Sequence, residues 1–405
     1  MRILFLTARL PYPPTRGDRL RAYHFLRVLS REHRLTLLSF IGNEHEAGNL
    51  NPLRAFCEDI QLVHRPPWQS TLSAAAGLWR PLPLQALYYR SPVMQGAIDR
   101  LLAREAFDAV YVHLFRMAQY VSGRFRPYRI LDLTDAISGE VVRSLPYREP
   151  FWRLVYRLEL PRIQRYEREM VGRFDETWVI SETERAAVAA ELGPNTPGNG
   201  RLPPNLRVVP NGVETERYRP QVRPATAPAL VFVGHMGVFH NIDAAERLAT
   251  VILPRVREEV PSARLDIIGA EPAARVRALA GRPGVRVLGH VTDLNAALNE
   301  STVFVAPLRF AAGVQNKVLE AMAAGLPVVT TAEVNAGLRA TPGEHLLVAE
   351  DDETLAALTI DLLRDPAQRA RLAAAGREFV LRDFRWEAVA ERMREVAARI
   401  ASGQA

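Results

Sequence analysis

The chain has 405 residues, of which 48% are hydrophobic and 24% charged, with a formal net charge of +7 and one cysteine, Cys57. This length exceeds what one hydrophobic core usually serves, so we expect two or three domains of an ordinary globular protein. The single cysteine excludes an intrachain disulfide. No segment approaches the ~20 apolar residues that cross a bilayer, and Met1–Thr7 is too short for a signal peptide, so we expect a cytoplasmic protein, free or associated with the inner face of a membrane.

Short apolar runs alternate with longer helical patterns along the whole chain, which predicts parallel sheets covered by helices on both faces. In chain order, strands are expected at Ile3–Leu6, Leu35–Ser39, Ile60–Val63, Ala109–His113, Ile130–Leu133, Thr177–Ile180, Leu206–Val209, Ala229–Gly234, Arg264–Ile268, Val285–Leu288, Val303–Pro307 and Pro327–Thr330. Helices are expected at Arg19–Glu32, Pro161–Phe174, Ala244–Glu259, Asn316–Ala324 and Leu355–Arg364. Pro161 is expected to open its helix, since its missing N–H has no cost in a first turn.

Two such arrays in one chain predict two doubly wound, Rossmann-like domains. The stretch 214–228 has three prolines and few apolar residues, so we place a linker there, between a first domain at 1–213 and a second at 229–380. Gly193–Pro204 is expected to be a loop inside the first domain. Phe384–Ile400 has the apolar spacing of an amphipathic helix, and we expect residues 381–405 to pack back toward the first domain.

Positive charge is concentrated in the first half. Residues 1–210 carry 29 Arg and 21 acidic residues, whereas residues 211–405 carry 23 cations and 24 acidic residues. This asymmetry indicates either an anionic partner of the first half, such as a lipid surface or a lipid-linked phosphate, or a solvated arginine-rich surface. No zinc, helix-turn-helix or RNA-reading motif is visible, so we do not expect nucleic acid as a partner.

The segment 307–329 predicts a strand, loop, helix, turn and second strand. Gly313 suits a tight loop that opens a helix, and a helix N-terminus binds phosphate readily. Arg309 precedes the loop, and Lys317, the single lysine among 52 basic residues, lies close to the helix start. Lys317 and Glu320 share a helix face at i and i+3. We expect the pair to bind a diphosphate and a ribose; the alternative is a solvent-facing ion pair.

The run from Gly313 to Val329, Gly-x-x-x-Lys-x-x-Glu-Ala-Met-Ala-x-Gly-x-Pro-Val-Val, resembles the donor-site signature of the family 4 retaining glycosyltransferases, which have the two-domain GT-B fold with a cleft between the domains. Other segments resemble the family in the same order along nearly the whole chain. They are Trp178–Glu182, Val209–Val213, Val231–Gly234 and Val285–His290. Within the family, the chain is most similar to bacterial exopolysaccharide sugar transferases, including those associated with exosortase (PEP-CTERM) systems.

The resemblance implies transfer of a hexosyl group from a nucleotide-diphosphate sugar, most simply a UDP- or GDP-sugar, to a glycan or lipid-linked acceptor, with retention and without a metal or resident cofactor. Glu320 would bind the donor ribose, and Lys317 with Arg309 would bind the diphosphate as catalytic cations. His113 would lie against the sugar or, alternatively, be a structural histidine. The other positions implied to contact the donor are Gly17, Gly234, His290, Val291, Gly313, Val314, Gln315 and Asn316.

Two departures from the family pattern stand out. The family often has a second glutamate eight residues before the first, but position 312 is alanine here, and the Arg and Lys that often follow the strand at 231–234 are replaced by the segment Gly234–Asn241. They leave two other functions open: a nucleotide-sugar 2-epimerase of the same fold, and an inactive nucleotide-sugar-binding accessory subunit.

Two further segments have more than one interpretation. Asp132-Leu-Thr-Asp135 closes a predicted strand, and we favour a turn or a polar contact to the acceptor over a metal site. Phe151–Leu160 mixes aromatic residues with arginine at helical spacing, and we favour packing in the core over contact with a membrane surface.

Overall fold

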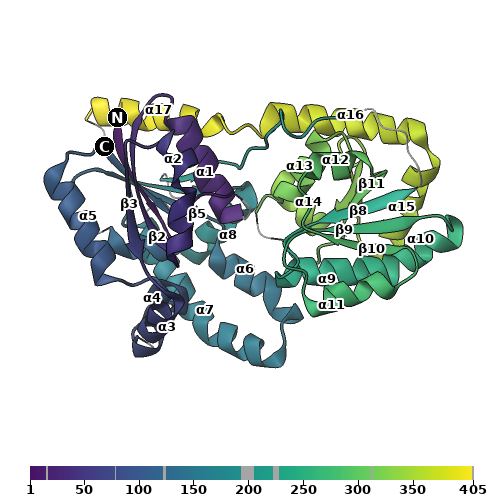
Figure 1. Cartoon of the computed structure of the whole chain (residues 1–405), viewed down its shortest axis with the longest axis horizontal. Coiled ribbons are helices and arrows are strands. Elements are labelled where there is room, and N and C mark those ends of the chain that lie inside the picture. The colour runs from purple at the N-terminus through teal and green to yellow at the C-terminus, as the bar shows by residue number, and fades with distance from the viewer. Residues whose placement is uncertain are drawn as a thin grey trace. The chain divides into compact units, whose positions relative to one another are not determined.

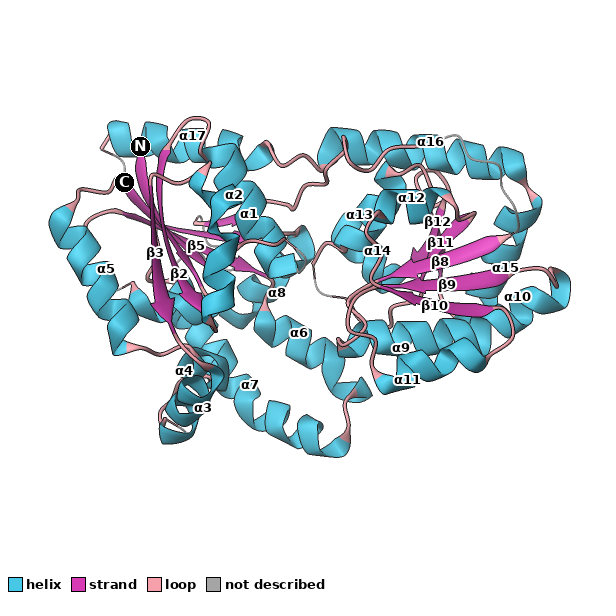
Figure 2. Ribbon diagram, viewed as in Figure 1, coloured by secondary structure: helices cyan, strands magenta, loops and turns pink. Residues whose placement is uncertain are grey.

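The computed structural model describes residues 1–14, 17–77, 79–121, 125–192, 205–221, 228–311 and 313–403. The chain forms two compact units, Met1–Pro210 with Trp386–Ala405 and Asn211–Arg385. Each unit has its own parallel sheet with helices on both faces (Figures 1 and 2). This confirms the predicted pair of doubly wound, Rossmann-like domains. The stretch 214–228 falls within the second unit, and the loop expected at Gly193–Pro204 lies outside the described residues, as do Arg16 and Ala312.

The first sheet has the strand order β3-β2-β1-β4-β5-β6-β7 among the described residues, and its neighbouring strands run parallel. The strands are β1 (Arg2–Thr7), β2 (Arg34–Ile41), β3 (Asp59–His64), β4 (Ala109–His113), β5 (Tyr128–Thr134), β6 (Glu176–Val179) and β7 (Leu206–Val208). The helices of this unit are α1 (Gly17–Leu29), α2 (Asn51–Arg54), α3 (Pro67–Ala76), α4 (Leu84–Tyr88), α5 (Pro92–Arg104), α6 (Ile137–Ser144), α7 (Pro150–Val171), α8 (Glu182–Leu192) and α17 (Ala388–Ala401). Short 3-10 turns lie at Glu44–Leu50, Phe115–Tyr120 and Leu145–Tyr147.

The central strand β1 shows why this sheet is buried on both faces. Leu4 and Leu6 belong to one apolar cluster, whereas Ile3 and Phe5 belong to another. Successive side chains of a strand point to opposite faces, so a continuous apolar run serves two cores. The second cluster also contains residues of α1 and of the carboxyl-terminal segment, including Trp386 and Met393. The amphipathic pattern predicted for that segment is therefore confirmed, although the helix itself begins at Ala388.

The second sheet has the strand order β10-β9-β8-β11-β12-β13 among the described residues, again all parallel. Its strands are β8 (Ala229–Val233), β9 (Arg264–Ile268), β10 (Val285–Gly289), β11 (Val303–Ala306), β12 (Val328–Thr331) and β13 (Leu347–Ala349). Its helices are α9 (Phe239–Arg247), α10 (Leu253–Glu259), α11 (Ala274–Ala278), α12 (Leu294–Asn299), α13 (Asn316–Ala323), α14 (Ala332–Leu338), α15 (Asp352–Arg364) and α16 (Pro366–Asp383). A π-helical turn, Leu248–Ile252, joins α9 to α10, and a 3-10 turn lies at Leu279–Gly281.

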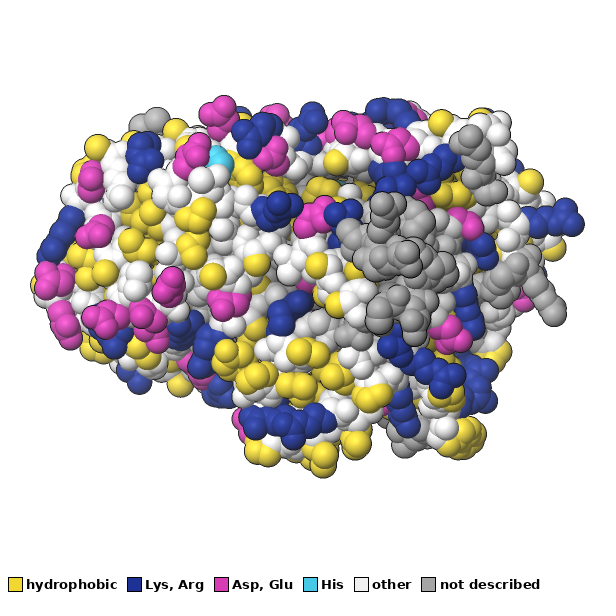
Figure 3. Space-filling model, turned by 180° about the vertical axis from the view of Figure 1, so that it is seen from behind, with side chains coloured by type: hydrophobic (Ala, Val, Ile, Leu, Met, Phe, Trp, Pro, Cys, Tyr) yellow, Lys and Arg dark blue, Asp and Glu magenta, His cyan; other side chains and the backbone are white. Residues whose placement is uncertain are grey.

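The predicted start of α7 at Pro161 is wrong. The helix begins eleven residues earlier, at Pro150, which occupies the first turn, and Pro161 lies inside it. Since Pro150 provides the same missing N–H and fixed φ, two prolines in one segment offered two starting points. The preferred interpretation of Phe151–Leu160 as core is also wrong, because Phe151, Trp152, Leu154 and Leu158 are exposed. Figure 3 shows hydrophobic side chains interspersed with arginines on this part of the first unit.

Candidate functional site

The loop between β11 and α13 lies at the carboxyl end of the second sheet. Gly313 has φ 51°, so the predicted positive φ is confirmed, and Gly313 and Val314 are buried. The loop rests against α14, where a Cβ added to Gly337 would lie 2.0 Å from the carbonyl oxygen of Gly313. Glycine at position 337 therefore lets the backbone of the loop approach α14 closely.

Replacing Gly337 by alanine should displace this loop. A methyl group that cannot be accommodated without moving backbone costs about 1–3 kcal/mol. We expect the free energy of unfolding of the second unit to fall by that amount. Urea-induced unfolding followed by far-UV circular dichroism measures it. Gly281→Ala is the matched control, because no atom lies within 4 Å of a Cβ added there. Equal stability of both variants would contradict the close contact between α14 and the loop.

Lys317, on the first turn of α13, is held by the first turn of α9. Its Nζ donates a hydrogen bond to Asn241 Oδ1 and lies 5.2 Å from the centre of the Phe232 ring. Asn241 Nδ2 donates to His235 O at 3.0 Å, which fixes the amide with its oxygen toward Lys317. The side chain retains some exposure, but the surrounding protein atoms lower the pKa of Lys317 to about 7. Lys317 thus donates one hydrogen bond to a neutral amide and is a poorly solvated cation.

Gly234 makes room for this arrangement. A Cβ at position 234 would lie 2.7 Å from the side-chain carbon Cγ of Asn241. A Cβ at Gly269, at the end of the neighbouring strand, would lie 1.6 Å from Gly234 O. The carboxyl ends of β8 and β9 therefore approach each other without side chains, beside the amide that binds Lys317.

Glu320 lies one turn beyond Lys317 on the same helix face. Burial raises the pKa of Glu320 to about 7, against the opposing effects of a hydrogen bond with Tyr218 and of the charges of Arg217 and Lys317. Tyr218 is buried, and its carbonyl oxygen accepts a hydrogen bond from Arg377 Nη1 at 3.1 Å. The backbone of Tyr218 is therefore held by Arg377, while its side chain bonds Glu320. The pKa values of Lys317 and Glu320 are both about 7.

Arg309, the second predicted cation, forms an ion pair with Asp243 of α9. Its Nε lies 3.0 Å from Asp243 Oδ2, and Nη2 bonds the other carboxylate oxygen. The Arg309 side chain remains 44% exposed. Lys317 and Arg309 therefore contact residues two positions apart on α9, and Asp243 offsets the charge of Arg309.

The other predicted donor contacts lie at the same carboxyl edge of the second sheet. Gln315 is the N-cap residue of α13, and Asn316 Oδ1 accepts a hydrogen bond from Asn211 Nδ2 at 3.1 Å. His290 and Val291 directly follow β10, and His290 is exposed. The structure thus gathers these residues, with Gly234, Gly313, Val314, Arg309, Lys317 and Glu320, at the edge where parallel sheets bind ligands.

His113 and Gly17 belong to the first unit. His113 is 2% exposed; its Nδ1 lies 3.2 Å from Asp132 Oδ2, and its Nε2 lies 2.9 Å from Asp18 O. Both ring nitrogens thus face oxygen acceptors, as expected of the structural histidine that the sequence left open. Gly17 begins α1 and is exposed, and no atom lies within 4 Å of a Cβ added there. Neighbouring atoms of the first unit therefore do not require glycine at this position.

Asp132 is the centre of a buried polar network at the carboxyl end of β5. It is fully buried and accepts two hydrogen bonds from Arg21. Arg21 Nε donates to Asp132 Oδ2 at 2.7 Å, and Arg21 Nη2 donates to Asp132 Oδ1 at 3.0 Å. It also accepts from the Tyr111 hydroxyl and from the Thr134 amide, the latter at 3.2 Å. The Arg21 guanidinium and the hydrogen bond from His113 hold the pKa of Asp132 well below its usual range, against the effect of burial. Asp132 is thus an anchor of the strand end, and no group of metal-binding side chains occurs among the described residues.

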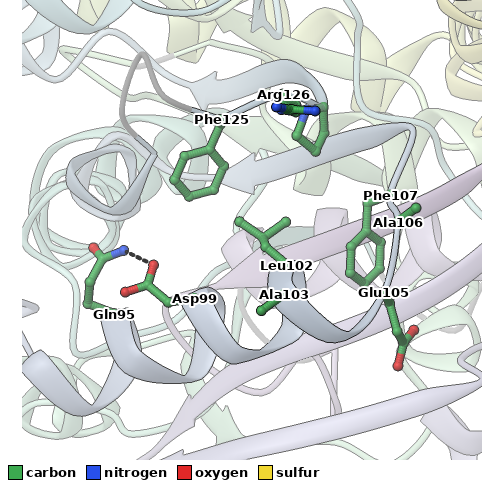
Figure 4. A pocket seen from close by; sticks show the side chains of 10 residues that line it. Gln95, Asp99, Leu102, Ala103, Glu105, Ala106, Phe107, Phe125 and Arg126 are labelled. Carbon is green, nitrogen blue, oxygen red and sulfur yellow. Dashed lines mark hydrogen bonds between the residues drawn. The ribbon is translucent and has the colours of Figure 1, made fainter.

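A separate hollow of ≈ 650 Å³ lies on the first unit, at the amino ends of β4 and β5 (Figure 4). Leu102, Phe107 and Phe125 line it, and at its rim Gln95 donates a hydrogen bond to Asp99 at 3.0 Å. Parallel sheets bind ligands at the carboxyl ends of their strands. This hollow is therefore not the candidate site.

Residues 227–365 match the family model described as Glycosyl transferases group 1. The matched segment lies within the second unit and contains Gly234, Asn241, Arg309, Lys317 and Glu320. Over 213 residues, the chain is 30% identical to the GDP-mannose-dependent monoacylated alpha-(1-6)-phosphatidylinositol monomannoside mannosyltransferase of Corynebacterium glutamicum. That match covers 48% of this chain and 56% of the relative, so the chain spans about half the length of this curated protein.

Solved structures match beyond residues 227–365. The sucrose-phosphate synthase of Thermosynechococcus elongatus has a TM-score of 0.75 at 16% identity, over 100% of both chains. Anabaena HepE in complex with UDP has a TM-score of 0.70 at 14% identity, over 98% of this chain and 100% of that one. At such identities the likeness establishes the fold alone, which is the GT-B architecture of two Rossmann-like domains.

Sequence reasoning did not single out Asn241, Asp243 and Tyr218. Asn241 was visible only as one of the polar residues left where an Arg and Lys pair was expected. Tyr218 lies in the stretch interpreted as a linker, and its contact with Glu320 joins residues about a hundred positions apart. A pattern of local spacing carries no signal for such a contact.

Proposed function

We propose that this protein is a glycosyltransferase that moves a sugar from a nucleotide-diphosphate sugar to a glycan or lipid-linked acceptor, with retention at the anomeric carbon. The observation that carries the proposal is that Lys317 and Glu320 share one face of α13 while Asn241 of α9 binds Lys317, all within the residues that match the group 1 model. A Corynebacterium glutamicum relative is named as a GDP-mannose-dependent mannosyltransferase, and Anabaena HepE was crystallised with UDP. Both names support a nucleotide-sugar donor.

The positive charge at this site suits a diphosphate leaving group. As the bond between the anomeric carbon and the diphosphate breaks, negative charge grows on the diphosphate, and fixed cations and backbone N–H groups at a helix start stabilise it. In this site, Lys317 and Arg309 are the two side chains proposed to supply positive charge. The acceptor hydroxyl forms the new bond on the same face, and its proton passes to the departing diphosphate. The nucleotide sugar is a co-substrate, and the proposal includes no resident cofactor or metal.

Glu320 is proposed to bind the hydroxyls of the donor ribose. Its carboxylate lies on the helix face of Lys317, so one ligand can contact both through adjacent phosphate and ribose groups. The neighbouring hydroxyl of Tyr218 orients the carboxylate. The named relatives are transferases, and Lys317, Arg309 and Glu320 are all present, so neither a 2-epimerase nor an inactive subunit is favoured.

The acceptor is proposed to meet the carboxyl edge of the first sheet. Asp135 follows β5 there, and its Oδ1 is buried without a hydrogen-bond partner among the described residues. Burial and the charges of Glu184 and Glu140 raise the pKa of Asp135 well above its usual range. A carboxyl group offers oxygen acceptors in its ionised form and also an O–H donor in its protonated form, which suits a hydroxyl-rich acceptor. Assembly of an exopolysaccharide, on a lipid carrier at the cytoplasmic face of an anionic membrane, is the setting that we propose.

Donor binding tests the proposal. A thermal-shift and calorimetric screen of the full chain against UDP-, GDP- and ADP-sugars should find at least one that binds and raises the melting temperature. Glu320→Gln should weaken that binding about 10- to 100-fold, because it removes charge-assisted hydrogen bonds worth about 1.5–3 kcal/mol. Glu333→Gln, at an exposed position on α14, is the matched control. An unchanged dissociation constant in Glu320→Gln would remove the ribose assignment.

A second arm separates transfer from epimerisation. Donor incubated without acceptor should keep its sugar unchanged, whereas conversion of the sugar would identify an epimerase. Failure of every donor to bind the wild-type chain would contradict the proposed function as a whole.

A further inference from the structure

Exposed hydrophobic side chains are concentrated in one part of the first unit. Of the twelve large hydrophobic side chains that are exposed among the described residues, ten lie between positions 68 and 158. Scattered exposed apolar side chains are ordinary, but a contiguous group indicates a contact surface. Seven of the ten lie on or next to α3 and α7 and define what we term the α3–α7 surface: Trp68, Leu72, Trp79, Phe151, Trp152, Leu154 and Leu158.

Helix α3 has serines toward the protein and exposes its large apolar side chains, together with Gln69 and Thr71. Its fully buried residue is Ser70, whose Oγ accepts a hydrogen bond from Arg65 Nε at 2.9 Å. Arg65 also donates to Ser73 Oγ at 2.9 Å, while Trp68 and Leu72 are 61% and 60% exposed. Helices that face water bury the apolar side. The exposure of Trp68 and Leu72 on α3 is the reverse of this pattern.

Helix α7 adds a second apolar stripe next to α3. Phe151, Leu154 and Leu158 are spaced to lie on one face of the helix, and all three are exposed. Glu159 Oε2 accepts a hydrogen bond from the amide of Leu84, at the start of α4, and α4 packs against α3. This contact fixes α7 beside the α3–α4 pair, and Figure 2 shows the three helices together on the first unit.

The charge around this surface is mainly positive, although Glu149 at the start of α7 and Glu169 near its end are exposed. Residues 60–98 contain three arginines and no acidic residue. On α7, Arg157 and Arg165 are exposed, whereas the acidic Glu159 is buried and paired with Arg162 and with the Leu84 amide. Figure 3 shows arginines among the hydrophobic side chains of this part of the unit. Aromatic and leucine side chains mixed with arginines are typical of helices that lie in the interface of an anionic membrane.

We infer that the α3–α7 surface inserts into the headgroup region of an anionic phospholipid membrane. Trp68, Leu72, Trp79 and the exposed face of α7 enter the apolar boundary, and Arg157 and Arg80 contact lipid phosphates. A second copy of this chain is the less suitable occupant, because a twofold interface would bring the same arginines face to face. None of the helices among the described residues is long and apolar enough to cross a membrane, so the contact is interfacial.

The inference rests on the proposed function but concerns a surface that shares no residue with the donor site. Membrane binding and donor binding can therefore be tested, and can fail, independently.

The fluorescence of the five tryptophans reports membrane binding. Trp68, Trp79 and Trp152 are on the α3–α7 surface, whereas Trp178 and Trp386 are buried in the first unit. With the full chain, vesicles containing about one-third phosphatidylglycerol should shift the fluorescence to the blue, and brominated acyl chains should quench it. Vesicles of phosphatidylcholine alone should have a much smaller effect.

Leu72→Ser with Leu158→Ser removes apolar contacts but keeps every tryptophan, and we expect it to weaken binding to the anionic vesicles at least about tenfold. Arg157→Gln should weaken it about fivefold and reduce its dependence on salt. Leu288→Ser and Leu381→Ser, the exposed leucines of the second unit, are the matched controls and should bind as the wild type does.

Three results would overturn the inference. The first is the absence of binding to anionic vesicles by a wild-type chain that binds its donor. The second is binding that Leu72→Ser with Leu158→Ser leaves unchanged. The third is a dimer in analytical ultracentrifugation that the same double variant dissociates while vesicles remain unbound, which would assign the surface to self-association.

Discussion

Replacing Lys317 by arginine is expected to lower the rate of sugar transfer by at least about 100-fold while the fold is kept. Lys317 Nζ fits between the Asn241 amide and the Phe232 ring, and a planar guanidinium on a longer stem does not occupy the same place. Loss of one well-placed group that stabilises developing charge typically costs a factor of 100 to 1,000. In a chain whose other 51 basic residues are arginine, a lysine here indicates that the site excludes the larger cation.

Initial rates at saturating donor measure the effect, and circular dichroism verifies the fold. The matched control is Arg364→Lys on α15, which makes the reverse exchange at an exposed residue. Arg364 forms an ion pair with Glu259 of α10. Exposed ion pairs contribute about 0–1 kcal/mol, so the control should retain wild-type turnover. Near wild-type turnover in Lys317→Arg would contradict the proposal that Lys317 stabilises the charge on the diphosphate.

The same variant should change the pH profile of donor binding. Burial lowers the pKa of Lys317 and raises that of Glu320, each to about 7. Binding needs the ammonium and the carboxylate together, so affinity should peak near pH 7. It should fall on the acid side as Glu320 gains a proton and on the alkaline side as Lys317 loses one. Arginine does not lose its proton in this range, so Lys317→Arg should flatten the alkaline side alone. Glu320→Gln should flatten the acid side.

The sheets were predictable because each buried parallel strand appears in the sequence as a short, continuous run of apolar residues. All but one of the thirteen strands among the described residues correspond to predicted apolar runs, and β4 and β9 have the predicted bounds. The exception, β13, has three residues at the edge of its sheet. Such a strand is too short for a pattern to stand out. Its pairing with β12 depends on contacts that only the folded sheet provides.

The helices were less predictable where the sequence offered competing signals. Pro150 and Pro161 both suit a first turn, and the chain uses the earlier one. Phe151, Leu154 and Leu158 have the spacing of a buried stripe, yet they face outward. Periodicity shows that a helix has an apolar side, but it does not show whether protein or lipid covers that side.

The candidate site was predictable only in its chemistry. The sequence indicated Lys317, Glu320 and the positive φ of Gly313, because a loop glycine and a charged pair near a helix start form a local pattern. It did not reveal that Asn241 binds Lys317 or that Tyr218 bonds Glu320. These contacts join distant segments, and the pKa values near 7 arise from the enclosure that those segments create.

Replacing Arg21 by methionine is expected to destabilise the first unit by about 3–5 kcal/mol, the largest effect on stability that we predict. Arg21 and Asp132 are both fully buried, so the variant leaves the Asp132 carboxylate without its cation. Tryptophan fluorescence follows this unit alone, because all five tryptophans lie in it. Arg173→Met, which breaks an exposed ion pair with Glu169 in the same unit, is the control and should change stability by less than about 1 kcal/mol.

Acid should distinguish the loss of charge pairing from the loss of packing. The pKa of Asp132 is lower in the folded protein than in the unfolded chain, so its stabilising effect is complete above the unfolded pKa of about 4 and is lost as the pH falls below it. The wild type should therefore lose stability below about pH 4. Arg21→Met should lose less over the same range, since the folded-state pKa of Asp132 rises when the guanidinium is removed. A further change of Asp132 to leucine should recover part of the loss, because a buried pair replaced on both sides leaves no uncompensated charge. If Arg21→Met unfolds with the wild-type midpoint and acid dependence, then the ion pair does not stabilise the carboxyl end of β5, where Asp132 lies.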